Sequence, residues 1–129
     1  MVKVREAMIK EVLTIDIEEN VDNACKIMGE KHIGSLIVTI QGKPIGIFTE
    51  RDLLSKIILK GLKLEKAKVK DFMSEPLTVI NPDFNLKEAA RIMTQLNIRR
   101  LPVIENEKLI GILTSADITR ALANSPLKF

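Results

Sequence analysis

The chain has 129 residues, of which 46% are hydrophobic and only 3% aromatic, with no Trp and no Tyr. This length fits one compact domain or two small repeats that share a core. That core must be aliphatic, because few aromatic side chains are available to fill it. The formal net charge of +3 is a mild basic excess. Together with the scarcity of aromatic rings, it argues against a surface that stacks the bases of single-stranded nucleic acid.

Cysteine usage and hydropathy indicate the compartment. Cys25 is the single cysteine, so neither an internal disulfide nor a cysteine-based zinc site is expected. The N-terminal sequence is charged where a signal peptide needs an apolar stretch. No apolar run approaches the roughly 18 residues that a membrane-spanning helix requires. We therefore expect a soluble, cytoplasmic protein that has no contact with a membrane.

The predicted elements follow one order twice. A short strand is expected at Thr14-Ile15, then a helix with Asn20 at its N-cap and apolar residues at helical spacing, Val21, Ala24, Cys25 and Met28. Two β-branched runs follow, residues 36–40 and 45–48. The polar turn between them predicts a β-hairpin. A second helix is expected over residues 52–60.

The second half of the chain predicts the same elements. They are a strand at Thr78-Val79, a helix that Asn85 and Glu88 begin as a capping box, a hairpin of residues 101–104 and 109–113, and a helix over residues 116–122. Between residues 31 and 55, nine of 25 positions are identical to the residue 65 positions later. The chain is therefore two copies of one unit, with Gly46 repeated as Gly111 and Asp52 as Asp117.

The order β-α-β-β-α, twice, predicts a mixed α/β (α+β) fold. We place the first repeat at residues 1–60, a linker at 61–68 and the second repeat at 69–129. Each repeat is too small to bury much apolar surface alone, so we expect the two to pack sheet to sheet. The lysine-rich stretch from Lys60 to Lys70 is expected to be a solvated connection.

An ordered set of motifs occurs in both copies. Each copy has a Met shortly before Leu-Thr, then a helix, a Leu-x-Val strand and the pattern Gly-Ile-x-Thr-x-x-Asp, at residues 46–52 and 111–117. Leu101-Pro102-Val103-Ile104 completes the set. The chain resembles a tandem pair of cystathionine-β-synthase-type (CBS) domains, a stand-alone Bateman module, over essentially its whole length.

The resemblance implies a fold and a function. CBS pairs pack about a pseudo-twofold axis and commonly form homodimers. Clefts between their repeats bind adenosine-containing ligands, which are AMP, ADP, ATP or S-adenosylmethionine. Binding regulates an enzyme or transporter, here a separate and unknown partner protein. No required cofactor or metal is implied.

The family's ligand contacts are carried over to matching positions. The resemblance assigns ribose contacts to Asp52 and Asp117, with Thr49 and Thr114 on the ribose-phosphate side. A carboxylate accepts two hydroxyl donors, and a helix start favours phosphate. The alternative is that Thr-x-x-Asp only caps the helix. Capping is plausible for Thr, but Asp is shorter than the usual Glu or Gln and is expected to reach back poorly.

Other residues complete the predicted ligand set. The resemblance places Thr14, Ile15, Thr78 and Val79 at the adenine. Gly46 lies inside an apolar strand, where close approach of a ligand or backbone, or a bulge, would explain it. Arg99 and Arg100 are expected to pair with phosphate oxygens. Their counterparts Gly34 and Ser35 carry no charge, so the two sites are expected to be unequal. His32 is expected to be a surface or capping residue.

Three functions compete at this point. The first is a regulatory adenine-nucleotide sensor, and the second is a ligand-independent dimerisation or assembly module. The third is nucleic-acid binding through the lysine-rich stretch, which the mild charge disfavours. An enzyme is not expected, because one His and one Cys supply no nucleophile with a base in reach. Cys25, aligned with Ala90, is expected to be a small core residue.

Overall fold

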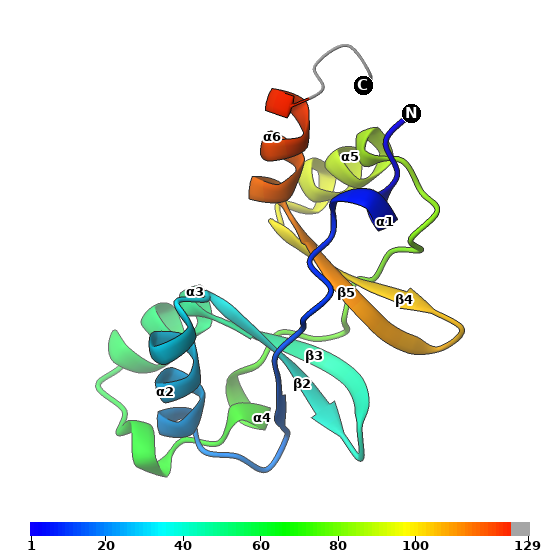
Figure 1. Cartoon of the computed structure of the whole chain (residues 1–129). Coiled ribbons are helices and arrows are strands. Elements are labelled where there is room, and N and C mark those ends of the chain that lie inside the picture. The colour runs from blue at the N-terminus through cyan, green and yellow to red at the C-terminus, as the bar shows by residue number, and fades with distance from the viewer. Residues whose placement is uncertain (125–129) are drawn as a thin grey trace. The chain divides into compact units, whose positions relative to one another are not determined.

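Two compact units make up the computed structural model, which describes residues 1–124. One unit, here unit 2, is the continuous segment Leu13–Leu77. The other, unit 1, combines residues 1–12 with the chain from Thr78 onward. Figure 1 shows the N-terminal segment running alongside elements from the far end of the chain. Residues 125–129 of the predicted second repeat lie outside the described residues.

Unit 2 is a three-stranded sheet with helices. Its strands are β1 (Thr14–Asp16), β2 (Ser35–Ile40) and β3 (Lys43–Thr49), in the order β1-β2-β3, with β1 parallel and β3 antiparallel to β2. Helix α2 (Val21–Lys31) lies between β1 and β2 in the chain. After β3 come α3 (Glu50–Asp52), the π-helix η1 (Leu53–Ile58), the 3-10 helix η2 (Leu64–Lys66) and α4 (Val69–Phe72).

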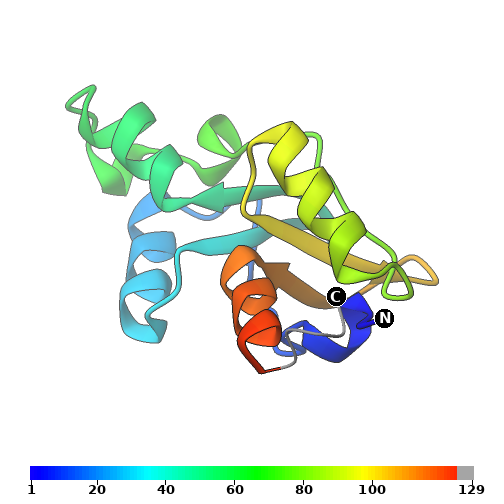
Figure 2. The ribbon, with the colours of Figure 1, turned by 90° about the horizontal axis from the view of Figure 1, so that it is seen from above.

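Unit 1 repeats this plan with fewer strands. It begins with α1 (Val4–Ala7) and continues with α5 (Leu86–Leu96), the hairpin of β4 (Arg100–Glu105) and β5 (Lys108–Thr114), and α6 (Ser115–Asn124). Figure 2 shows α5, α6 and the hairpin from above. In both hairpins the two turn residues have positive φ, at Gln41-Gly42 and Asn106-Glu107, which matches the twist of the flanking strands. The predicted hairpins and the mixed α/β class are confirmed.

The strand predicted at Thr78-Val79 is wrong, and two prolines explain why. In unit 2, Leu13 O accepts from Ile37 N at 3.2 Å and Ile17 N donates to Thr39 O at 2.9 Å. The residues 65 positions after the donors Ile37 and Ile17 are Pro102 and Pro82, which have no N–H. Only the central pair of bonds remains, through Ile80 and the backbone of residues 102 and 104, at 3.0 Å each.

The surviving bridge also corrects the alignment of the two repeats. Ile15 pairs with Val38, and Ile80 pairs with Val103. Ile15 and Ile80 are both buried, whereas Val79 is 44% exposed. The counterpart of Ile15 is therefore Ile80, 65 residues later, and not Val79. The spacing of 65 residues between the copies therefore holds through this segment as well.

The short segment before each repeat folds onto the other repeat. In unit 1, Val4 is fully buried beside Leu86, Leu101 and Leu113 in the core. In unit 2, Val69 is fully buried in the core that contains Phe48. The antiparallel bridges Ile9–Ile112 and Ile47–Ser74 tie these segments to β5 and β3. Residues 1–12 thus belong to the first repeat in sequence and to the second in space.

The segment predicted as linker 61–68 is not only a solvated connection. Ala67 is 7% exposed and belongs to the unit 2 core. Val21 N donates to Ala67 O at 2.8 Å, and Asn20 Nδ2 donates to Glu65 O at 3.0 Å. Its lysine side chains remain exposed at Lys63 and Lys66. Charge predicts where these side chains point but does not predict the burial of the small residues between them.

Candidate adenosine-ligand site

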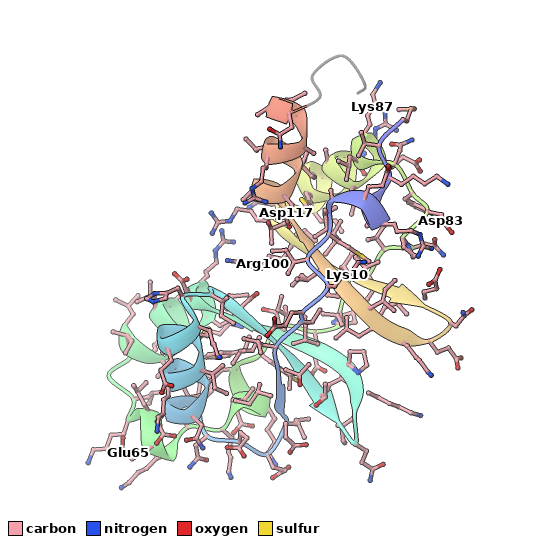
Figure 3. The ribbon with its side chains drawn as sticks, viewed as in Figure 1. Lys10, Glu65, Asp83, Lys87, Arg100 and Asp117 are labelled. Atoms are coloured by element: carbon pink, nitrogen blue, oxygen red, sulfur yellow. The ribbon has the colours of Figure 1, made fainter. Side chains whose placement is uncertain are left out.

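The two Thr-x-x-Asp motifs place a buried carboxylate at the start of a helix. Asp52 is 4% exposed and Asp117 is 2% exposed, and they are the buried charged residues of the described chain. Thr49 ends β3 and Thr114 ends β5, so each hydroxyl and carboxylate meet where a strand turns into a helix. Figure 3 shows Asp117 at the beginning of α6.

Both carboxylates cap their helices. Asp117 Oδ2 accepts from Thr114 N at 2.8 Å and from Thr114 Oγ1 at 2.9 Å, and Asp117 N donates to Thr114 Oγ1 at 3.2 Å. Thr49 and Asp52 form the same set at 3.0, 3.1 and 3.2 Å. The expectation that Asp reaches back poorly is wrong, because the Asp side chain closes a full capping box with the residue three positions earlier.

The second carboxylate oxygen differs between the two motifs. Asp117 Oδ1 accepts from Arg120 Nη1 at 2.9 Å. Asp52 Oδ1 accepts from Lys56 Nζ at 2.8 Å and from Ser74 Oγ at 3.1 Å. The side chain of Arg120 is 64% exposed. A carboxylate offers about four lone-pair positions, so Asp117 Oδ1 is able to accept further donors beside Arg120.

Backbone and methionine side chains closely approach both strand glycines. A Cβ on Gly46 would lie 2.9 Å from Ser74 O and 3.0 Å from Met73 Sδ. A Cβ on Gly111 would lie 2.9 Å from Ile9 O. The strand register also shifts beside both glycines, between Val38 and Thr39 and at the equivalent point of β4. The bulge and the close approach are therefore both present.

The two arginines lie next to Thr114. Arg100 is half-buried and lies opposite Thr114 in the register of β4 and β5. Arg99 is exposed, and its carbonyl oxygen accepts from Ser115 N at 3.0 Å. The equivalent strand pair in unit 2 is Ser35 with Thr49. Unit 1 thus gathers positive charge at its Thr-x-x-Asp motif, and the corresponding strand position of unit 2 does not.

The residues predicted at the adenine lie at different places. Thr14 is exposed on β1 and Ile15 is buried beneath it. Thr14 and Ile15 line a pocket of about 360 Å³ within unit 2, together with Asp16, Glu19, Asn23, Lys26 and Ile27. Thr78 is half-buried and Val79 exposed.

Sequence reasoning missed Ile80, Ser74, Lys56 and Arg120. The 65-residue spacing would have revealed Ile80, and helical spacing from each Asp would have revealed Lys56 and Arg120.

His32 and Cys25 have structural roles. His32 and its counterpart Asn97 adopt the left-handed conformation that ends α2 and α5, with φ of 55° and 54°, which confirms His32 as a capping residue. Cys25 packs against the unit 2 core. Within residues 1–124, no cluster of His, Cys, Asp and Glu side chains is suited to hold a metal ion, and no helix is long and apolar enough to cross a membrane.

The environment of Cys25 gives a testable reactivity. Partial burial, with the neighbouring Asp22 carboxylate as the second cause, raises the pKa of the Cys25 thiol. A raised pKa leaves less thiolate at any pH below it, and the thiolate is the nucleophile. We expect iodoacetamide at pH 8 to alkylate Cys25 more slowly in the folded protein than in urea. Equal rates in the two states would contradict this.

Comparisons with known proteins agree with the geometry. The family model described as the CBS domain matches the chain twice, at residues 4–59 and 69–124. An uncharacterized protein of Methanopyrus kandleri is 39% identical over 119 residues, which are 91% of this chain and 61% of that protein. Inosine-5'-monophosphate dehydrogenase of Methanocaldococcus jannaschii is 32% identical over 92% of this chain, and the match covers 23% of that enzyme.

Solved structures show the same fold. The hexameric CBS-CP12 protein from bloom-forming cyanobacteria superposes with a TM-score of 0.88 and 34% identity, over 98% of this chain and 77% of that one. The chain spans between 32% and 61% of the length of the first three curated relatives it matches. The matched part is in each case a portion of a longer protein.

Proposed function

The chain belongs to the CBS-domain family as a tandem pair, and on this premise we propose that it is a regulatory module that binds an adenosine-containing ligand at its Thr-x-x-Asp motifs. The supporting observation is that the buried carboxylates of the described chain are Asp52 and Asp117, each at the same point of its repeat. The candidate ligands are AMP, ADP, ATP and S-adenosylmethionine, and binding would be signalled to a separate partner protein.

The carboxylate geometry suits a ribose. A cis-diol donates two hydroxyl hydrogens, and Asp117 Oδ1 accepts a hydrogen bond from the exposed end of Arg120. If Arg120 swings away, Oδ1 is free to accept ribose hydroxyls while Oδ2 keeps the helix cap through Thr114. The cap therefore pre-positions the carboxylate for the ligand, and the capping and binding roles are compatible.

The two motifs are proposed to differ in preference. Arg99 and Arg100 lie beside Thr114, where they would pair with phosphate oxygens, and unit 2 has Gly34 and Ser35 there. Asp52 Oδ1 already accepts from both Lys56 and Ser74. We therefore assign the tighter nucleotide site to the Asp117 motif and expect ATP or AMP to bind there in preference to adenosine.

Isothermal titration with AMP, ATP, S-adenosylmethionine and NADH tests the proposal. Micromolar binding of an adenosine ligand is expected, and Asp117→Ala should weaken it about tenfold or more, because one hydrogen bond to a charged group contributes about 1.5–3 kcal/mol. Asp117→Ala also removes a helix cap, at a cost of about 1–2 kcal/mol. Glu88→Ala is the matched control, because it opens the α5 capping box in the same unit.

The outcomes separate the alternatives. Glu88→Ala should bind the ligand as the wild type does. If ligand binding were weakened equally in both variants, Asp117→Ala would be acting through lower folding stability and not through a lost ligand contact. Arg99→Ala and Arg100→Ala should reduce the preference for phosphorylated ligands over adenosine. Wild-type protein that is free of co-purified nucleotide and binds none of the four ligands would reject the sensor.

The second candidate is a ligand-independent assembly module. It is favoured by the similarity to a cyanobacterial protein described as hexameric. This function predicts a homodimer or larger assembly whose mass by analytical ultracentrifugation is unaffected by Asp52→Ala and Asp117→Ala. A reducing, cytoplasmic setting suits either function, because Cys25 is a free thiol.

A further inference from the structure

Four hydrogen-bond donors occupy the carboxylate of Asp52. Its Oδ2 accepts from Thr49 N at 3.0 Å and from Thr49 Oγ1 at 3.1 Å. Its Oδ1 accepts from Lys56 Nζ at 2.8 Å and from Ser74 Oγ at 3.1 Å. A carboxylate offers about four lone-pair positions, so these donors fill it. A ribose hydroxyl must therefore displace one of them before it bonds to Asp52.

The two donors to Oδ1 come from separate elements of unit 2. Lys56 lies in η1, and Ser74 follows α4, which Figure 1 labels together with α3. The backbone of Ser74 pairs with Ile47 of β3, at 2.8 and 3.0 Å. Lys56 Nζ also donates to the carbonyl oxygen of Phe72, the last residue of α4, at 3.0 Å. We call Lys56 and Ser74, bonded to Asp52, the latch. The latch ties the motif to the end of α4.

The second repeat lacks the side chains for a latch. The residue 65 positions after Lys56 is Ala121, and the residue 65 positions before Ser74 is Ile9. Ile9 forms the same kind of backbone bridge to its own unit as Ser74 does. The backbone arrangement is therefore shared, but alanine and isoleucine side chains have no hydrogen to donate. The latch is an addition to the first repeat that the fold of a repeat does not require.

We propose that the latch is an autoinhibitory contact, which keeps the Asp52 motif closed to ribose until Lys56 and Ser74 are displaced. A cis-diol supplies two hydroxyl donors, and these replace the two donors on Oδ1. The Lys56 side chain is 43% exposed, so its ammonium is able to leave toward solvent. This inference rests on the proposed function of the Thr-x-x-Asp motifs as ribose sites, and it makes the first of them a regulated site.

Ligand binding and closure of the latch exclude each other, so they are linked. A ligand on Asp52 removes the side-chain bonds that hold the end of α4 to the motif. By reciprocity, any change that loosens these bonds raises the affinity for the ligand. The backbone bridge between Ser74 and Ile47 stays, which limits the change to local opening. Occupancy of the first motif is thereby reported to residues 72–77, from which the chain enters unit 1 at Thr78.

Opening the latch by substitution tests the proposal. Lys56→Met combined with Ser74→Ala removes both donors and keeps the apolar part of the lysine side chain. Asp117→Ala in the same chain leaves Asp52 as the motif carboxylate for AMP. Isothermal titration should then show AMP binding about tenfold tighter with the latch open than with the latch intact, because the ligand no longer displaces a hydrogen bond to a charged group. Asp52→Asn in the open variant should remove this gain.

The matched control removes a lysine and a serine that do not contact Asp52. It is Lys70→Met combined with Ser55→Ala. Lys70 is 41% exposed and pairs with Glu18, and the Ser55 hydroxyl donates to a backbone carbonyl oxygen. The control should titrate with AMP as the parent chain does. Hydrogen exchange without ligand should be faster over residues 72–77 in the open variant and unchanged in the control.

A chain with Asp117 intact covers the case in which Asp117→Ala does not fold. There, the open variant should bind a second equivalent of AMP at concentrations where the wild type binds one. Equal AMP binding with the latch open and intact overturns the proposal, as does the same gain in the control. Faster exchange without tighter AMP binding also overturns it, because the latch is then a structural contact only.

The titrations separate this proposal from the function on which it rests. AMP binding by the wild type without a gain in the open variant rejects the latch and keeps the nucleotide sensor. AMP binding by the open variant alone supports the latch and rejects the site assigned to Asp117. Absence of AMP binding in every variant rejects both.

Discussion

Val4→Asp is expected to open unit 1 and leave unit 2 folded, although Val4 lies in the first sequence repeat. Val4 is fully buried in the core of unit 1. A buried carboxylate without a partner costs several kcal/mol, a large share of the about 5–15 kcal/mol that stabilises a domain. Backbone hydrogen exchange followed by mass spectrometry should show faster exchange over residues 78–124 and little change over residues 13–77.

Two further variants make this prediction specific. Val69→Asp, at the equivalent buried position in unit 2, should give the reverse pattern, with faster exchange over residues 13–77. Lys10→Asp, an exposed position in the same N-terminal segment, should change the free energy of unfolding by less than about 0.5 kcal/mol. Faster exchange confined to residues 13–60 in Val4→Asp would show that the segment does not fold onto the second repeat.

Gly111→Ala is expected to destabilise unit 1 by about 1–3 kcal/mol, the usual cost of overpacking. The new Cβ would lie 2.7 Å from Met8 Sδ and 2.9 Å from Ile9 O. Met8 is able to move, but the Ile9 carbonyl is fixed because its oxygen accepts from Ile112 N at 2.9 Å. Urea unfolding measures the loss.

Gly29→Ala is the matched control for the same substitution. Gly29 lies inside α2, and apart from its chain neighbours and the backbone of the helix itself, no atom lies within 4 Å of the position its Cβ would take. Alanine there should stabilise the protein by about 1 kcal/mol, because glycine is a poor helix former. If both substitutions stabilised the protein, the close approach of the N-terminal segment to β5 would be wrong.

The interaction of Arg5 with acidic residues of unit 1 supports the same picture. Arg5 Nη2 lies 2.6 Å from Glu105 Oε2 and 3.2 Å from Asp83 Oδ1. Hydrogen bonds to Glu105 and then Asp83 raise the pKa of the Arg5 guanidinium. Figure 3 shows Asp83 beside the N-terminal helix. These pairs are exposed and contribute little stability. Together with the buried contact of Val4, they fix the position of the N-terminal segment on unit 1.

Local pattern was enough to predict much of this protein. Periodicity of apolar residues located α2, α5 and both hairpins, and the polar turns lie where positive φ is needed. The Asn85–Glu88 capping box is present. Asn20 also occupies an N-cap position, but its side chain makes no cap bond and donates to Glu65 O instead. A cap position is a local property, whereas the partner of the cap side chain depends on which distant carbonyl lies within reach.

The sequence alone therefore determined the repeat, the order of the elements and the family, because these depend on residue spacing along the chain. Only the tertiary structure decided which repeat each N-terminal segment completes, since the patterns around Val4 and Val69 are the same whichever partner they find. It also decided that the second copy keeps a single bridge at Ile80 in place of a strand, because Pro82 and Pro102 have no N–H groups to bond across the strand pair. The carboxylates were correctly singled out by repetition, but their burial and their bonds to Lys56, Ser74 and Arg120 required the packed helices.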